Sequence, residues 1–216
     1  MNKKLTISLV LASILFVSCK KDETVTPEAI KSVESKTSTS IVATTQRSST
    51  NETGKFVEKP EIKKQGLIHI KSFMEGLKGT LHSTLQADPT HMVAINACSS
   101  MAIKMTDEYN QNLTRAKVRR TALKYRNPAN KPDATDRFVM NKISNTSFSP
   151  VVVELSDHYR VYKPLVMKKP CLICHASTSK MSPAVVKNIQ KTYPADMATG
   201  FIEGEFRGTV VVEIKK

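Results

Sequence analysis

Large apolar side chains are distributed unevenly along the chain, and this restricts where a folded core can form. Residues 20–59 consist largely of Ser, Thr, Lys and Glu, with hardly any large apolar residues. Such a stretch cannot bury enough surface to offset its conformational entropy, so residues 19–60 are predicted to form a flexible tether. One folded domain is therefore expected, over residues 61–216.

The first 18 residues have the features of an export signal. Lys3 and Lys4 precede an apolar run over residues 5–17, which is shorter than the roughly 20 residues that a membrane-spanning helix needs. Cys19 directly follows Phe-Val-Ser, a sequence that resembles a bacterial lipobox. We expect a lipoprotein signal peptide over residues 1–18, with Cys19 lipidated. The chain would then be extracytoplasmic and anchored to a bacterial membrane, facing the periplasm or lying on the outer-membrane surface. Ordinary cleavage, with Cys19 incidental, is the alternative.

The spacing of apolar residues predicts helices in the first half of the domain. Apolar side chains recur at intervals of three and four from Leu67 to Leu85, as one face of an amphipathic helix requires. Asp88-Pro89 offers a cap and a first turn, so a second helix is expected over residues 91–110. Short helices are also predicted to begin at Asp133 and to span residues 183–191.

Runs of β-branched and aromatic residues predict strands, mostly later in the chain. Residues 151–155 and 159–162 flank Ser-Asp-His and predict a β-hairpin, and residues 206–214 predict a terminal strand. Residues 118–126 are expected to be extended. Helices first and strands mostly later predict an α+β domain with an antiparallel sheet.

The sequence Cys171-Leu-Ile-Cys174-His175 has the most direct chemical meaning. Two thiols three positions apart can add to the two vinyl groups of haem, and the next residue offers an imidazole to the iron. A thioredoxin-like redox pair would open a helix in a βαβ unit, whereas an antiparallel hairpin is predicted before this motif. A structural zinc site needs a second ligand pair, and the sequence has no other CxxC. Behind an export signal, the motif predicts one covalent haem c with His175 as an axial iron ligand.

The second axial ligand is less determined by the sequence. Cys98 lies in the predicted second helix, and helical spacing places His91, Met101 and Met105 on the same stripe. A thiolate ligand would lower the reduction potential, and a methionine ligand would raise it. The stripe is equally typical of a helix face packed into the core, since buried free cysteine and methionine are common there. Spacing alone leaves both interpretations open.

The chain is strongly basic, which bears on its partners. Lys and Arg outnumber Asp and Glu by 33 to 19 overall and by 24 to 13, or +11, in residues 61–216. Arg120 and Arg126 are candidates for contacts with haem propionates, because the arginine fork suits a carboxylate, while most of the basic residues are expected to be solvated. Nucleic-acid binding is disfavoured by export and by an aromatic content of only 6%. A redox partner protein with an acidic docking face is expected instead.

Four segments of the chain resemble a known family of small c-type haem proteins with a PAS-like domain. Some members of that family stand alone, and others form the sensory part of histidine kinases. The resemblance covers about residues 65–214. The segments are Ala97-Cys98-Ser99, residues 118–133, residues 171–175 and residues 193–208.

The resemblance implies a PAS-like antiparallel sheet preceded by two helices. It also implies thioether attachment at Cys171 and Cys174, His175 as one axial ligand and Cys98 as the opposite one. One departure from the family pattern is visible, since Thr135-Asp136 stands where the family tends to have Trp-Glu.

Three functional classes follow from these features. Electron transfer or redox buffering on a membrane surface is favoured, because the motif predicts a single haem on a tethered, basic domain. A haem-based redox or gas sensor that signals through a partner protein is the alternative, by analogy with the kinase-attached relatives. An enzyme such as a peroxidase is least favoured, since His91 is the only acid–base candidate on the expected face.

Overall fold

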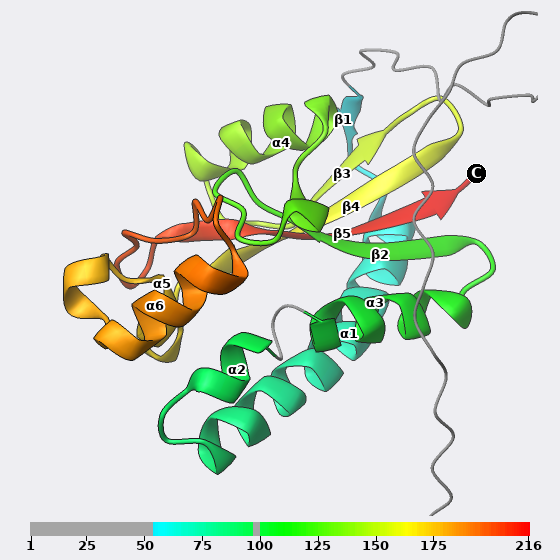
Figure 1. The fold of residues 1–216 in the computed structure, drawn as a ribbon. Coiled ribbons are helices and arrows are strands. Elements are labelled where there is room, and N and C mark those ends of the chain that lie inside the picture. The colour runs from blue at the N-terminus through cyan, green and yellow to red at the C-terminus, as the bar shows by residue number, and fades with distance from the viewer. Residues whose placement is uncertain (1–53, 97–99) are drawn as a thin grey trace, which may run out of the picture. The chain divides into compact units, whose positions relative to one another are not determined.

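A five-stranded antiparallel sheet forms the centre of the domain (Figure 1). The computed structural model describes residues 54–96 and 100–216. The strand order is β1-β3-β4-β5-β2, and every neighbouring pair is antiparallel. The strands are β1 (Lys55–Val57), β2 (Ala116–Thr121), β3 (Val151–Glu154), β4 (His158–Val166) and β5 (Phe206–Lys215). The predicted α+β fold with a PAS-like antiparallel sheet is confirmed, as are the hairpin β3–β4 and the terminal strand.

Helices account for most of the remaining described residues. They are α1 (Pro60–Ala87), α2 (Met92–Asn96), α3 (Ala102–Gln111), α4 (Ala134–Ser144), α5 (Leu172–His175) and α6 (Pro183–Thr192). In the described part of the chain, three short 3-10 turns accompany them: η2 (Pro128–Asn130), η3 (Lys169–Cys171) and η4 (Thr178–Lys180). The predicted first helix lies within α1, and α6 matches the predicted short helix. The helix predicted over residues 91–110 corresponds to α2 and α3, between which residues 97–99 lie outside the described residues.

The two faces of the sheet are buried by different helices, because side chains alternate along each strand. Ile70 and Phe73 of α1 pack on one face, against a cluster that includes Val210 and Val212 of β5. Val139 and Ile143 of α4 pack on the other face. Figure 1 shows α1 and α4 on opposite sides of the sheet accordingly.

A second apolar cluster lies at one end of the sheet, away from the main core. Ile95 of α2 packs there with Val185 and Ile189 of α6. The side-chain amide of Asn188 also donates a hydrogen bond to the Met92 carbonyl oxygen at 3.3 Å. This cluster packs α2 against the α5–α6 segment and so fixes the position of α2 relative to that segment.

Helix α4 begins with a capping box in which Asp136 takes part. The Asp133 carboxylate accepts the backbone N–H of Asp136 at 2.7 Å, and the Asp136 carboxylate accepts the N–H of Asp133 at 3.2 Å. Aspartate at this position therefore performs the task that glutamate performs in the usual capping box. The prediction that a helix begins at Asp133 is confirmed.

The sheet extends into the segment that was predicted to be tether. Strand β1 pairs with β3, with Phe56 opposite Val153. The predicted boundary at residue 60 is therefore too late by a few residues, because a three-residue strand carries too little apolar pattern to be recognised. The predicted signal peptide and Cys19 lie outside the described residues. Within residues 54–96 and 100–216, no helix has the length and apolar character needed to cross a membrane.

Candidate functional site

The Cys171–His175 motif forms a compact turn just beyond β4. Within it, the Cys171 N–H donates to the Lys168 carbonyl at 2.8 Å, and the Ala176 N–H donates to the Leu172 carbonyl at 3.2 Å. Both cysteines are half-buried and unbridged. The motif follows a strand of an antiparallel sheet, and this setting differs from the βαβ unit of thioredoxin-like redox pairs.

The imidazole of His175 is held by a backbone carbonyl. Its Nδ1–H donates to the carbonyl oxygen of Ala198 at 2.7 Å. The ring of Phe201 stands edge-on to the imidazole, with 6.3 Å between ring centroids. Burial and the nearby charges of Arg207 and Arg126 lower the pKa of His175 to about 3, although the bond to Ala198 acts in the opposite direction. His175 is therefore neutral at physiological pH, and Nε2 keeps its lone pair for a metal ion.

Arg126 links the motif to the loop that carries Ala198. Its Nε and Nη2 groups donate to the two carboxylate oxygens of Asp196 at 3.2 and 3.1 Å. The same Nη2 donates to the carbonyl oxygens of Cys174, at 2.6 Å, and Ala198, at 3.2 Å. The Asp196 carboxylate also accepts the Ala198 N–H at 2.8 Å. Because the Arg126–Asp196 ion pair is almost fully buried, it fixes the position of both segments.

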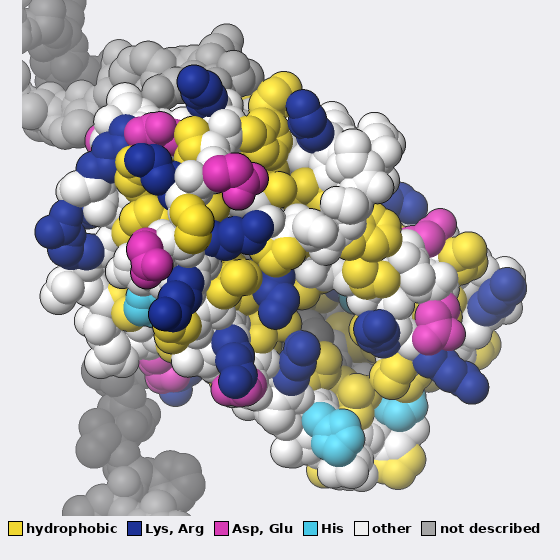
Figure 2. Space-filling model, turned by 180° about the vertical axis from the view of Figure 1, so that it is seen from behind, with side chains coloured by type: hydrophobic (Ala, Val, Ile, Leu, Met, Phe, Trp, Pro, Cys, Tyr) yellow, Lys and Arg dark blue, Asp and Glu magenta, His cyan; other side chains and the backbone are white. Residues whose placement is uncertain are grey.

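The motif forms part of the wall of a pocket between the helices. The cavity has a volume of about 170 Å³ and opens to solvent. The lining residues include Cys171, Cys174 and His175. Apolar side chains from α1 and α2 complete the lining: Leu81, Leu85, Ala94 and Ile95. Figure 2 shows a hollow on the rear face of the molecule, bordered by hydrophobic and by Lys or Arg side chains.

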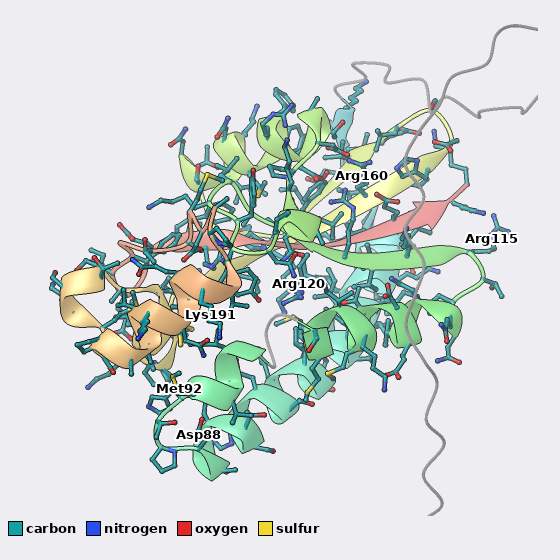
Figure 3. All side chains as sticks on the ribbon, in the orientation of Figure 1. Asp88, Met92, Arg115, Arg120, Arg160 and Lys191 are labelled. Atoms are coloured by element: carbon teal, nitrogen blue, oxygen red, sulfur yellow. The ribbon has the colours of Figure 1, made fainter. Side chains whose placement is uncertain are left out.

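Three arginines also line the pocket: Arg120, Arg126 and Arg207. Arg120 extends from β2 toward α2 and α3 (Figure 3). The Arg207 guanidinium donates to the Lys124 carbonyl at 2.9 Å. Burial and the charges of Arg126 and Arg120 lower the pKa of Arg207 to about 10, although Asp196 acts in the opposite direction. Positive charge therefore exceeds negative charge around the pocket, which favours an anionic group such as a carboxylate.

Comparison with known proteins places this architecture in a family. The sequence profile of the Tll0287-like family matches residues 20–215. The chain belongs to the Tll0287-like family. A solved structure described as the cyanobacterial haem protein Tll0287 is similar to it, with a TM-score of 0.56 and 24% sequence identity. The similarity covers 74% of this chain and 98% of that chain. Among curated proteins, the search found no match.

Membership of the Tll0287-like family confirms the resemblance inferred from the four sequence segments. At 24% identity, the solved Tll0287 structure shows a shared fold. The pocket, its three arginines and the carbonyl partner of His175 belong to the structure of this chain and are not inferred from the Tll0287 structure.

The structure places the candidates for the second axial ligand differently from one another. Met101 and Met105 line a separate, smaller cavity. His91 precedes α2 with a φ of 61°, in the left-handed region, and its Nδ1 has no hydrogen-bond partner among the described residues. Cys98 lies outside the described residues, two positions after the end of α2. The identity of this ligand stays a prediction.

Sequence reasoning missed several residues of the site. Asp196, Ala198 and Phe201 hold His175 or its neighbours, and Arg207 adds charge to the pocket. All four lie within residues 193–208, a segment that the family resemblance singled out without indicating their roles. The structure gives Arg126 a buried carboxylate partner, and its contact with a propionate stays a prediction.

Proposed function

We propose that this chain is an exported c-type cytochrome that binds one haem through Cys171 and Cys174 and exchanges electrons with a partner protein. The observation that carries the proposal is that Cys171, Cys174 and His175 line a single pocket that opens to solvent. The description of the solved relative as a haem protein supports haem as the occupant. A bound haem would supply a one-electron iron couple.

The lining of the pocket is chemically suited to both parts of a haem. Leu81, Leu85 and Ile95 offer apolar surface to a macrocycle. Arg120 and Arg207 offer positive charge to the propionates, and Arg126 is a third candidate for this contact. Arginine pairs with carboxylates through two parallel hydrogen bonds, so it fits this task better than lysine.

His175 is prepared to bind iron before any cofactor arrives. The bond from Nδ1–H to the Ala198 carbonyl holds the ring orientation and selects the tautomer in which Nε2 is the acceptor. A backbone carbonyl partner of this kind also raises the basicity of the ligating nitrogen.

For the opposite axial position we propose Cys98, with Met101, Met105 and His91 as alternatives. Support comes from the family resemblance and from α2, which brings Ala94 and Ile95 to the pocket wall shortly before Cys98. A thiolate there would stabilise ferric iron and give a low reduction potential. Two protein ligands would leave no open site, which favours electron transfer or redox buffering over catalysis or gas binding.

We also propose that Cys19 carries the lipid anchor and that residues 20–53 let the domain reach its partner. The apolar run before Cys19 and the polar composition after it support this arrangement. Attachment of haem outside the cytoplasm agrees with an exported, membrane-anchored chain.

The test is to express the protein in a bacterium that exports it and carries the haem-attachment machinery. We expect one haem per chain that stays bound after denaturation, with a pyridine haemochrome spectrum typical of two thioether bonds. The variant C171S/C174S should lose covalent haem almost completely. As a matched cysteine control, C98A should keep covalent haem and lose the thiolate features of the low-spin spectrum.

Other outcomes would contradict particular parts of the proposal. Haem that is fully extracted from the unsubstituted protein by acid–organic solvent would exclude covalent attachment. An unchanged spectrum in C98A would move the second ligand to Met101, Met105 or His91. Carbon monoxide binding by the unsubstituted reduced protein would show an accessible iron site and favour the sensing alternative.

A further inference from the structure

Acidic residues are missing from the part of the chain that surrounds the CxxCH motif. Between Asp157 and Asp196 the sequence contains no aspartate or glutamate. Seven basic residues lie in this interval: Arg160, Lys163, Lys168, Lys169, Lys180, Lys187 and Lys191.

We term residues 168–192 the basic lobe. This segment comprises η3, α5, η4 and α6, and it contains five of the seven basic residues. Its lysines are all exposed to solvent: Lys168, Lys169, Lys180, Lys187 and Lys191. Figure 3 marks Lys191 on α6, the last helix before the loop that carries Ala198. Each unit of charge on this lobe therefore faces solvent.

Some lysines elsewhere in the domain have an acidic partner on the same helix. Lys71 lies 4.0 Å from Glu75 on α1, and Lys104 lies 3.6 Å from Glu108 on α3. No lysine of the basic lobe forms an ion pair with an acidic residue in the described part of the chain. The carboxylate of Glu203 borders the lobe and accepts the Lys169 backbone N–H at 3.2 Å.

The first part of the basic lobe also lines the pocket. Pro170 is exposed and lines the pocket together with Cys171, so the attachment segment reaches the surface there. Lys168 and Lys169 immediately precede it in the chain. A haem joined to Cys171 would therefore have its attached edge close to the unpaired lysines.

We propose that the basic lobe is the docking surface for an electron-transfer protein with an acidic face. This inference rests on the proposed function, since it concerns the route by which electrons reach the pocket. Like-signed, unpaired charges around one opening attract an acidic surface over a distance and orient it toward that opening. Because the lysines are exposed, salt weakens the attraction.

The experiment uses the haem-bearing domain and an electrode coated with a carboxylate-terminated monolayer as the acidic surface. The lobe variant is K168Q/K169Q/K191Q, and the matched control is K64Q/K71Q/K117Q, which removes the same charge from exposed positions on α1 and β2. At low ionic strength we expect electron exchange to be at least about tenfold slower for the lobe variant, the lower end of electrostatic steering. The control should stay within about twofold of the unsubstituted domain, and high salt should remove the difference.

Equal losses in both variants would show an effect of net charge and overturn the docking surface, and so would an unchanged lobe variant. Binding of phosphatidylglycerol vesicles through the same lysines, without an effect on electron exchange, would assign the lobe to a membrane instead. The haem spectrum of every variant is recorded first. Absence of covalent haem would refute the proposed function, whereas haem-bearing protein that is indifferent to the lobe would refute the docking surface alone.

Discussion

At the scale of single residues, the carbonyl oxygen of Ala198 is shared by two donors. It accepts a hydrogen bond from His175 Nδ1–H at 2.7 Å and another from Arg126 Nη2–H at 3.2 Å. A cationic donor draws electron density from the carbonyl and weakens its bond to the imidazole. Asp196 limits this effect, because its carboxylate compensates the charge of Arg126. In the proposed haem-bearing protein, the ion pair would therefore set how strongly His175 donates to the iron.

Replacing Asp196 by asparagine should therefore raise the reduction potential of the haem-bearing protein. Two effects act in the same direction: a negative charge near the pocket is lost, and Arg126 polarises the Ala198 carbonyl more strongly. We expect a rise on the order of 50 mV, the size of one charge acting through an effective dielectric constant of about 20. Spectroelectrochemical titration measures it directly.

A matched control is Asp157→Asn, at the turn between β3 and β4. The nine residues of β4 separate this turn from the motif segment, and its carboxylate is exposed, so solvent and salt screen its charge. Its substitution should leave the potential nearly unchanged. An unchanged or lowered potential in D196N would show that the ion pair serves only the fold.

The sequence is informative about the site where chemistry fixes the spacing of neighbouring residues. Cys171, Cys174 and His175 were predicted together because the proposed thioether bonds and iron bond would have to be made from a single turn, and the structure places all three in the wall of one pocket. The partner of His175 could not, since a backbone carbonyl has no residue signature. The pairing of Arg126 with Asp196 joins residues that lie 70 positions apart, a distance at which only the folded chain brings them together.

At the scale of elements, the packing of α1 on the sheet depends on one glycine. A Cβ atom at Gly66 would lie 2.5 Å from Cγ2 of Val161, which is fully buried on β4. Gly79, farther along the same helix, would meet no atom of the described residues within 4 Å. The two glycines therefore have different roles, although both lower helix propensity.

Substituting each glycine by alanine should change the free energy of unfolding in opposite directions. Gly66→Ala forces the helix away from β4, and we expect a loss of about 1–3 kcal/mol from overpacking. Gly79→Ala should gain about 0.5–1 kcal/mol through helix propensity. Urea unfolding followed by circular dichroism gives both values. Equal effects in the two variants would show that α1 does not pack closely on Val161.

Elements with a strong period could be predicted from the sequence, and short ones could not. The apolar stripe of α1 and the β-branched runs of β3 and β5 repeat over enough residues to be recognised. Strand β1 has three residues, and its place in the sheet depends on pairing with β3. Likewise, α2 lines the pocket because it packs on α6, and no local sequence pattern encodes that packing.

At the scale of the whole molecule, one ionic cluster connects the sheet to α4. The carboxylate of Asp136, 1% exposed, accepts two hydrogen bonds from Arg119, at 2.7 and 2.9 Å, and one from the Tyr162 hydroxyl at 2.8 Å. Arg160 lies 3.4 Å from the same carboxylate. Glu213 joins Arg119 and Arg160 from β5, at 3.1 and 3.3 Å. Strands β2, β4 and β5 therefore share one buried charge with the start of α4.

This cluster should make the stability of the domain sensitive to acid. Burial acts to raise the pKa of Asp136, but the hydrogen bonds and charge of Arg119, the Tyr162 hydroxyl and the charge of Arg160 outweigh it and lower the pKa. A carboxyl whose pKa is lower in the folded than in the unfolded state stabilises the fold at pH values above its unfolded-state pKa, which is about 3.9. That contribution is lost as the pH falls through the lower, folded value.

Asp136→Asn should accordingly cost about 3–5 kcal/mol at neutral pH, because it leaves buried arginines uncompensated. The difference in free energy of unfolding between the unsubstituted domain and D136N should stay constant from neutral pH down to about pH 5. It should narrow below about pH 4, since only the unsubstituted domain loses a stabilising carboxylate there. Urea midpoints measured across this range test the expectation, with D107N, an exposed substitution on α3, as the control. A gap that persists unchanged at pH 2–3 would mean that the cost arises from altered packing, and the ionic cluster would then have no part in acid unfolding.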